Sequence, residues 1–267
     1  MSRITRIGVC TLWVVCAVIV HAQNQNSPGG DPKALSLAAR SLASMTSGTM
    51  LTGATLTGTA KRTVGTDTDS GSAVLKVRSA TGTRLDLGLA KGQLTEIHNT
   101  QTGAPKHYWF GPDQVVHRAP LHNSWVDAGW YFPPVSVVSM LSDPLMVLSY
   151  LGHETRSGVP VEHLRASRHL SGQDPAVTAL VQRLSTIDLY IDSSSTLPVA
   201  VAFAGHPDND AGVNFPIEIR FSNYQSMNGA QVPMQIEELV DGGTCLTISF
   251  SSITLNSGFS DSDFQIR

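Results

Sequence analysis

The sequence has few charged residues, few cysteines and no basic cluster, and each shortage excludes a class of protein. Among 267 residues only 15% are charged, with 18 Lys and Arg against 21 Asp and Glu. This composition argues against long disordered tails, coiled coils and collagen-like repeats. The lack of a Lys/Arg patch argues against a nucleic-acid partner, because phosphate contacts need one.

The first 22 residues have the three-part layout of a secretory signal peptide. Arg3 and Arg6 precede an uncharged apolar run at 7–20, and Val20 and Ala22 put small residues at the −3 and −1 positions of a cleavage site. We expect cleavage after Ala22 and a periplasmic or secreted protein. The run is shorter than the roughly 18–20 residues that span a bilayer, so an uncleaved anchor is the weaker alternative.

After cleavage the chain would contain a single cysteine, and its stability would come from a hydrophobic core. Removal of 1–22 takes away two basic residues and no acidic ones, which changes the net charge from −3 to −5. Only Cys245 would remain, so the exported chain cannot be a disulfide scaffold. We expect residues 23–30 to be a flexible tether and residues 31–267 to form a single domain stabilised by a hydrophobic core.

Three Asp-Pro pairs predict helix starts, since Asp caps free N–H groups and Pro fits the first helical position. Asp31-Pro32 precedes apolar residues at helical spacing and is followed by Gly48 as the stop. Asp174-Pro175 precedes the clearest helical pattern of the chain. Asp143-Pro144 leads into the apolar segment 145–151, which we expect to be a third short helix. The apolar positions of the first and the 174 helix are Leu35, Ala38, Leu42, Met45, Val177, Leu180, Val181 and Leu184.

Elsewhere apolar and polar residues alternate, which is typical of antiparallel strands with one buried face. Alternation is strict at 85–89, 187–191, 217–221, 232–236 and 246–250. Asn228-Gly229 has the signature of a type I′ hairpin turn. We predict a mainly β fold, with about ten or eleven strands in one strongly curved antiparallel sheet.

Motifs for catalysis and metal binding are absent from the sequence. It contains no Gly-x-Ser-x-Gly elbow, no His-Glu-x-x-His helix, no phosphate-binding Gly loop and no Cys-x-x-Cys pair. Asp208 begins a loop that lacks the closing Glu of a calcium site. None of the eight histidines after Ala22 has the local spacing of metal ligands, so we predict no metal and no cofactor. An enzyme would need distant groups such as His107, His117 and His153 to converge in a cleft.

The middle of the chain, around 135–151, is apolar on almost every side, which is more than one helix face can use. One interpretation is a helix pair that plugs the open side of the sheet as ordinary core. The other is a lid over an apolar cavity, in which methionines adapt to variable ligands. The residues that we expect to line such a cavity or its lid are Trp109, Trp125, Trp130, Phe132, Met140, Leu141, Leu145, Met146 and Leu148.

Several stretches resemble the LolA/LolB-like superfamily of periplasmic lipoprotein carriers and its secreted relatives. Residues 152–164 are similar to a hairpin of that fold, and 188–198 to the strand and turn that follow it. Phe221-x-x-Tyr224 with Gly229 and Pro233, and later Asn256 with Asp261-x-x-Phe264, look like its closing segments. The resemblance covers roughly residues 31–267. It implies an antiparallel half-barrel of about eleven strands, with helices on the concave side that receives acyl chains in the carriers, and no catalysis.

These observations favour an exported, non-enzymatic binding protein. We expect a monomer without a membrane span after cleavage, holding a hydrophobic small molecule or the acyl chains of a lipid or lipoprotein between sheet and helical lid. The alternative is an envelope interaction or sensing module with the same fold, a filled cavity and an exposed apolar or edge-strand patch.

Overall fold

The computed structural model describes residues 29–78, 82–100, 105–126 and 128–266, so the expected signal peptide and its cleavage site lie outside the described residues. The sheet contains fourteen strands. They are β1 (Gly29–Gly30), β2 (Gly53–Val64), β3 (Asp67–Arg78), β4 (Gly82–Leu89), β5 (Gly92–Asn99), β6 (Lys106–Phe110), β7 (Val116–Arg118), β8 (Met146–Arg156), β9 (Val159–Arg168), β10 (Ile187–Asp192), β11 (Pro198–Gly205), β12 (Phe215–Met227), β13 (Ala230–Val240) and β14 (Gly243–Leu255).

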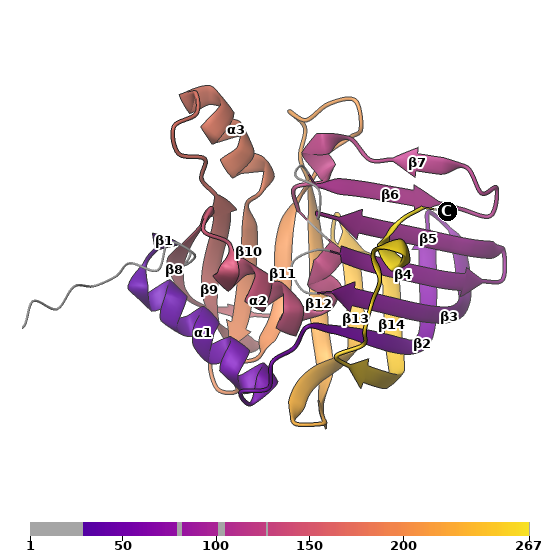
Figure 1. Cartoon of the computed structure of the whole chain (residues 1–267), viewed down its shortest axis with the longest axis horizontal. Helices are drawn as coiled ribbons and strands as arrows, with labels where there is room; N and C mark the ends of the chain where they lie inside the picture. The colour runs from indigo at the N-terminus through magenta and orange to yellow at the C-terminus, as the bar shows by residue number, and fades with distance from the viewer. Residues whose placement is uncertain (1–28, 79–81, 101–104, 127, 267) are drawn as a thin grey trace, which may run out of the picture.

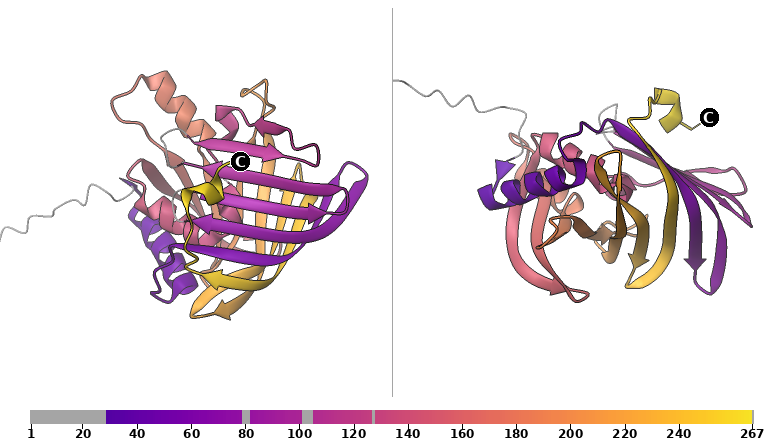
Figure 2. Two further views of the ribbon diagram at one scale, coloured as in Figure 1. Left: turned by 45° about the vertical axis from the view of Figure 1, so that its right-hand side comes forward. Right: turned by 90° about the horizontal axis from the view of Figure 1, so that it is seen from below.

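Two consecutive meanders make up this sheet. Its order is β1-β8-β9-β10-β11-β12-β13-β14-β2-β3-β4-β5-β6-β7, and every pair except the parallel β1–β8 is antiparallel. The last strand of the chain, β14, joins the C-terminal meander to the N-terminal one through β2. Seen from below, the sheet bends into an arch (Figure 2). The predicted curved antiparallel half-barrel is confirmed.

The structure has more strands than the eleven expected, because its smallest strands carry no alternation that a sequence pattern can reveal. β1 has two residues and β7 has three. β1 consists of the last two residues of the expected tether, Gly29 and Gly30, which pair with Val147 and Leu148. All five segments of strict alternation lie within strands, as predicted. Asn228 and Gly229 both have positive φ, at 50° and 86°, as a type I′ turn requires.

Two of the three helix predictions are confirmed at the expected caps. The helix α1 (Pro32–Thr46) begins after Asp31, whose Oδ1 accepts from the Lys33 N–H at 2.7 Å. In α3 (Pro175–Leu184), Asp174 Oδ1 accepts from the Ala176 N–H at the same distance. Each cap satisfies a free helix N–H and contributes about 1 kcal/mol.

The third helix prediction, over 145–151, is wrong. Residues from Met146 onward form β8, and the helix α2 (Pro133–Ser142) lies just before the Asp143-Pro144 pair. A short apolar run cannot distinguish a helix from a strand that is covered on both faces. Here the run finds pairing partners in β1 and β9, so its backbone groups are satisfied as a strand.

The helices α1 and α2 cover the concave side of the sheet (Figures 1 and 2). α1 packs on α2 and on both β8 and β13, which are not neighbours in the sheet, so it bridges the arch. Its buried face comprises Ala34, Leu37, Ala38, Ser41, Met45 and Thr46. Two short 3-10 helices, η1 (Leu121–Asn123) and η2 (Ala128–Tyr131), precede α2. No helix in the described part of the chain is both long and apolar enough to cross a membrane.

The outer face of the sheet carries charged pairs where alternation predicts polar side chains. Arg165 Nε lies 2.8 Å from Asp188 Oδ1, and Arg220 Nε lies 2.6 Å from Glu218 Oε1. The Arg156 guanidinium lies 3.8 Å from the centre of the Tyr190 ring. Ion pairs at a partly solvated surface each contribute only about 0–1 kcal/mol, so these pairs keep this face polar without fixing the fold.

The C-terminal segment packs against the outer face of β3–β5 and is anchored there by one side chain. Phe264, in the 3-10 helix η3 (Asp261–Phe264), is 1% exposed. Its ring lies beneath the Arg78 guanidinium at 4.8 Å and meets Phe259 edge to face. A Cβ on Gly82 would lie 2.7 Å from this ring, so the glycine makes room for it.

We predict that Phe264→Ala lowers the free energy of unfolding by about 3–4 kcal/mol, because it leaves a cavity under the segment. Gln265→Ala, an exposed neighbour, should change it by less than about 0.5 kcal/mol. Urea unfolding followed by circular dichroism measures both variants. Equal stabilities for the two variants would contradict an anchoring role of Phe264.

Candidate functional site

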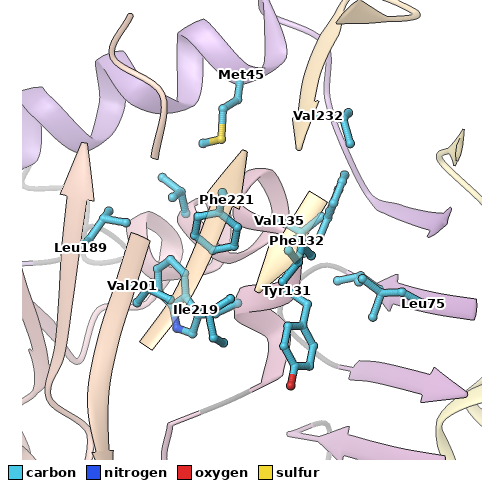
Figure 3. Close-up of a cluster of buried hydrophobic side chains, with 14 of the residues drawn as sticks. Met45, Leu75, Tyr131, Phe132, Val135, Leu189, Val201, Ile219, Phe221 and Val232 are labelled. Atoms are coloured by element: carbon cyan, nitrogen blue, oxygen red, sulfur yellow. The ribbon is translucent and has the colours of Figure 1, made fainter. Parts of the chain in front are cut away.

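The segment Trp130–Phe132 divides the interior of the arch. Phe132 is fully buried and packs into the central cluster of Val135, Ile219 and Phe221 (Figure 3). Trp130 lines a cavity on one side, and Tyr131 lines a cavity on the other. The core is therefore filled at its centre and hollow on either side of η2.

The first cavity, here called the α2 cavity, has a volume of about 320 Å³. Its apolar walls come from the segment between η1 and η2, from η2 and α2, and from the ends of β3, β8 and β10. They include Val77, Trp125, Trp130, Val135, Met140, Met146 and Ile187. Polar groups from Arg78, Asp143, Arg168 and the serines of α2 also line it. Arg168 is paired with Asp143, and Arg78 Nη1 lies 2.8 Å from Asp261 Oδ1.

Two adjoining cavities, here called the β5–β6 cavities, lie on the Tyr131 side of η2. Their volumes are about 270 and 290 Å³, and both are lined by Glu96, His107, Trp109 and Glu238. One is completed by residues of β11 and β12, the other by Leu85, Leu87 and Leu94 of β4 and β5. They share no lining residue with the α2 cavity.

A carboxylate and two imidazoles meet at the wall of these cavities. Glu96 and His98 are two residues apart on β5 and so face the same side, and His107 lies opposite His98 in the β5–β6 ladder. Glu96 Oε1 is 3.2 Å from His98 Nε2 and 2.8 Å from His107 Nε2, and the two rings stack at 3.8 Å. Burial opposes ionisation of Glu96, but its contacts with His107 and His98 hold its pKa well below the ordinary value.

A second carboxylate, Glu238 of β13, lies near this group. Burial and the ionised Glu96 raise the pKa of Glu238 to about 7, although the Tyr131 hydroxyl donates to Glu238 Oε2 at 2.5 Å. Burial and the charge of Glu238 also raise the pKa of Tyr131. Cys245 has its pKa raised to about 12 by burial and by Glu238, so its thiol is neutral and unreactive. Only one of the two carboxylates is thus fully ionised at neutral pH.

A second pair of histidines borders the same cavity. His206 is 3% exposed, and its Nδ1 donates to the Val213 carbonyl at 2.9 Å. His206 Nε2 has no hydrogen-bond partner among the described residues, which leaves an acceptor lone pair buried beside the cavity. His122 packs edge to face on His206 and donates from Nε2 to the Pro207 carbonyl at 3.0 Å.

The nine predicted lining residues do not form one site. Trp125, Trp130, Met140 and Met146 line the α2 cavity, whereas Trp109 lines the β5–β6 cavities. Phe132 and Leu148 are fully buried in the core cluster, Leu141 is partly buried against it, and Leu145 is 39% exposed. These last four line none of the cavities described above.

The histidines named for an enzyme do not all converge. His117 stacks on Trp109 at 4.0 Å, close to His107, but His153 lies on β8 and contacts Glu162 and Ser193. The sequence analysis missed the Glu96–His98–His107 group. The spacing of Glu96 and His98, two positions apart, and the register of the β5–β6 hairpin are the signals that could have shown it.

We predict that the free energy of unfolding falls as the pH rises from 4.5 through about 7. The carboxyl of Glu238 binds its proton more tightly in the folded protein than in the unfolded chain, where the ordinary pKa of 4.5 applies, so deprotonation favours unfolding. The loss attributable to Glu238 is roughly 2–3 kcal/mol. Glu238→Gln, which can still accept from Tyr131, should remove this part of the slope.

Urea unfolding of both proteins between pH 4.5 and 8, in buffer with a chelator, measures the difference. Groups that do not interact with Glu238 contribute equally to both curves, so the difference reports Glu238 together with the groups coupled to it, Glu96 and His98. Parallel curves over this range would show that Glu238 is ionised with an ordinary pKa.

Comparisons with known proteins support a fold and not a family membership. The chain matches no protein-family model and no curated protein. Among solved structures it is similar to a domain assigned to outer membrane lipoprotein sorting from Vibrio parahaemolyticus, with 16% identity, 87% of this chain and 96% of that chain covered, and a TM-score of 0.56. A LolA superfamily protein from Nitrosomonas europaea is similar at 12% identity, 87% and 97% coverage and a TM-score of 0.54.

A DUF1329 family protein from Desulfovibrio piger is also similar, with 12% identity, 87% and 96% coverage and a TM-score of 0.56. The chain therefore has a LolA/LolB-like fold, as the sequence resemblance predicted. At these identities the likeness concerns the fold alone.

Proposed function

We propose that this protein is an exported, non-enzymatic binding protein that holds an apolar or acylated ligand in the α2 cavity. The observation that carries the proposal is an apolar hollow between the curved sheet and η2–α2, with two arginines among its lining residues. The Vibrio parahaemolyticus domain with the same fold is assigned to lipoprotein sorting, and lipoproteins carry acyl chains. A lipid or the acyl chain of a lipoprotein is accordingly the class of ligand that we propose.

The physical basis of binding is burial of apolar surface. Each Å² of apolar surface removed from water contributes about 25 cal/mol, and methionine side chains such as Met140 and Met146 adapt to chains of different shape. The volume of about 320 Å³ lies at the small end of the range of ligand sites, so one short or partly inserted chain fits without rearrangement. The helix α2, which lines the cavity and packs on α1, then acts as the lid that retains it.

The charged groups of the cavity favour a ligand with an anionic head. Arg78 and Arg168 each have an acidic partner, Asp261 and Asp143, in the protein. A carboxylate or phosphate head could exchange with either partner, because guanidinium groups bind such anions in a bidentate manner. We propose that these two arginines set specificity and that the apolar wall supplies affinity.

The remaining parts of the proposal come from the sequence. Cleavage after Ala22 would place the mature chain in the periplasm or the medium as a monomer, with 31–267 as one binding domain and no nucleic-acid partner. Met140, Met146, Trp125 and Trp130 are the proposed contacts in the α2 cavity. Trp109 would meet only a ligand that enters the β5–β6 cavities.

We predict that Ser139→Trp abolishes uptake of a fluorescent fatty acid, with at least a tenfold loss of affinity, because the indole fills the α2 cavity that Ser139 lines. Val138→Trp is the matched control. It adds the same group to the same helix at a partly buried position that lines none of the cavities described above. Fluorescence titration measures binding, and circular dichroism melting checks that both variants fold.

Equal affinities of the two variants for the fatty acid would contradict the α2 cavity as the site. Native mass spectrometry of the exported protein provides a second test, since a carrier should retain co-purifying acyl chains. A clean apo mass together with no fatty-acid binding would contradict the proposal as a whole.

One observation favours the alternative of an interaction module with the same fold. The helix α3 projects from the sheet (Figure 1), and its Val177 and Leu180 are 45% and 47% exposed. Only Val181 and Leu184 of its apolar face are buried. Val177 and Leu180 lie three residues apart on one helix face, where an apolar patch of a partner protein can cover both. Two results together would favour this alternative over a lipid carrier. Native mass spectrometry would show the protein without a bound ligand, and Val177→Glu would abolish the binding of a partner protein.

A further inference from the structure

We propose that Glu96, His98 and His107 form a binding site for a divalent transition metal ion of the zinc type, with one coordination position open to the β5–β6 cavities. In the described part of the chain this is the one group of three or more His, Cys, Asp or Glu side chains whose ligand atoms all lie close together, within 4.8 Å of one another. The proposal is independent of the acyl ligand, because the α2 cavity shares no lining residue with this site.

The backbone fixes the three side chains on one wall. Glu96 and His98 are two positions apart along β5, and the pairing of His98 with His107 sets the third side chain from β6. Ligands held on neighbouring strands are positioned more accurately than ligands on loops. The site thus depends on the register of one hairpin and on no long-range contact.

The distances suit an ion with short bonds to nitrogen and oxygen. Zinc binds imidazole nitrogen at about 2.0–2.1 Å and carboxylate oxygen at about 2.0–2.2 Å, which puts tetrahedral ligand atoms roughly 3.4 Å apart. The Nε2 atoms of His98 and His107 lie 3.2 and 2.8 Å from Glu96 Oε1. Side-chain adjustments of about 1 Å therefore bring all three atoms into the coordination shell, without movement of the strands.

The donor set identifies the class of metal. Two imidazoles and one carboxylate suit Zn²⁺, Co²⁺ or Fe²⁺, whereas Ca²⁺ and Mg²⁺ prefer oxygen ligands. Three protein ligands leave a tetrahedral ion one free position, which distinguishes such a site from a closed structural zinc site. The side chains of Glu96 and His107 also line both β5–β6 cavities, so that position can be filled by water or by a donor group of a bound molecule.

The surroundings favour a dication. Glu96 and Glu238 line the same cavities, and the side chain of His98 is only 5% exposed. A buried dication carries twice the charge of a protonated histidine, so it attracts the carboxylates of Glu96 and Glu238 more strongly than a protonated histidine does. Binding leaves both Nε2 atoms without a proton, since each imidazole binds a metal through its lone pair. Affinity should therefore fall as the pH is lowered.

We predict that the exported protein, purified without a histidine tag and stripped with a chelator, binds one Zn²⁺ per chain in isothermal titration calorimetry. Glu96→Gln, which keeps the shape of the side chain, and His107→Gln should each weaken binding about 100-fold or more. His117→Gln, which changes a nearby half-buried histidine outside the group, should leave the affinity within about threefold. Zn²⁺ should raise Tm in the wild type and in His117→Gln only.

Co²⁺ provides a readout of geometry, because a four-coordinate Co²⁺ site gives strong visible absorption that a surface site does not. The same absorption in Glu96→Gln as in the wild type would overturn the proposal. So would the absence of Zn²⁺ binding, a stoichiometry that depends on His117, or equal losses in all three variants. Circular dichroism of each variant tests whether it is folded, so that a loss of Zn²⁺ binding is not mistaken for unfolding.

Discussion

The concave face of the sheet is apolar along nearly its whole length, and among the described residues no second sheet covers it. Leu189, Val201, Ile219 and Phe221 of β10–β12 and Leu75 of the more distant β3 belong to one continuous cluster (Figure 3). Apolar surface of this extent must be removed from water, at about 25 cal/mol per Å², or the arch would open. The rest of the structure depends on the helical segments that cover this apolar face, which are η2, α2 and α1.

The segments η2 and α2 fill the centre of the arch and leave a cavity on either side of η2. Phe132 and Val135 pack against the middle of the sheet, whereas Trp130 and Tyr131 point to different cavities. Protein interiors are normally packed as densely as organic crystals, so cavities of about 270–320 Å³ on both sides of one segment are sites that a ligand can occupy without unfolding the core. The two sides differ in chemistry, since one is rimmed by arginine and the other by histidine and carboxylate.

Local patterns predicted those parts of the fold that local interactions decide. The Asp31 and Asp174 caps accept from backbone N–H groups two residues away, so the local sequence reveals them. The alternating strands bury a single face, so the spacing of their apolar residues reveals them. The segment 146–151 was mispredicted because its character depends on β1 and β9, which supply its hydrogen bonds. For the candidate sites, the residue types were visible but the partition of Trp109 from Trp125 and Trp130 was not, since it depends on the path of η2 through the arch.

The polar group beside the β5–β6 cavities is hard to explain by stability alone. Buried ionic groups are often no better for stability than apolar residues of the same size, and a second carboxylate near the first adds repulsion. Glu238 keeps its proton up to about pH 7, and Tyr131 donates to it, which shows how the fold limits that repulsion without removing its cause. The neighbouring residues Leu85, Leu87 and Leu94 are apolar, so apolar residues such as leucine could also have occupied the positions of the polar group. Departures from the simplest packing concentrate at functional sites, where the lost stability is compensated elsewhere in the fold. Here the centre of the arch around Phe132 is filled with apolar side chains, while two carboxylates, two imidazoles and a phenol remain at its inner wall.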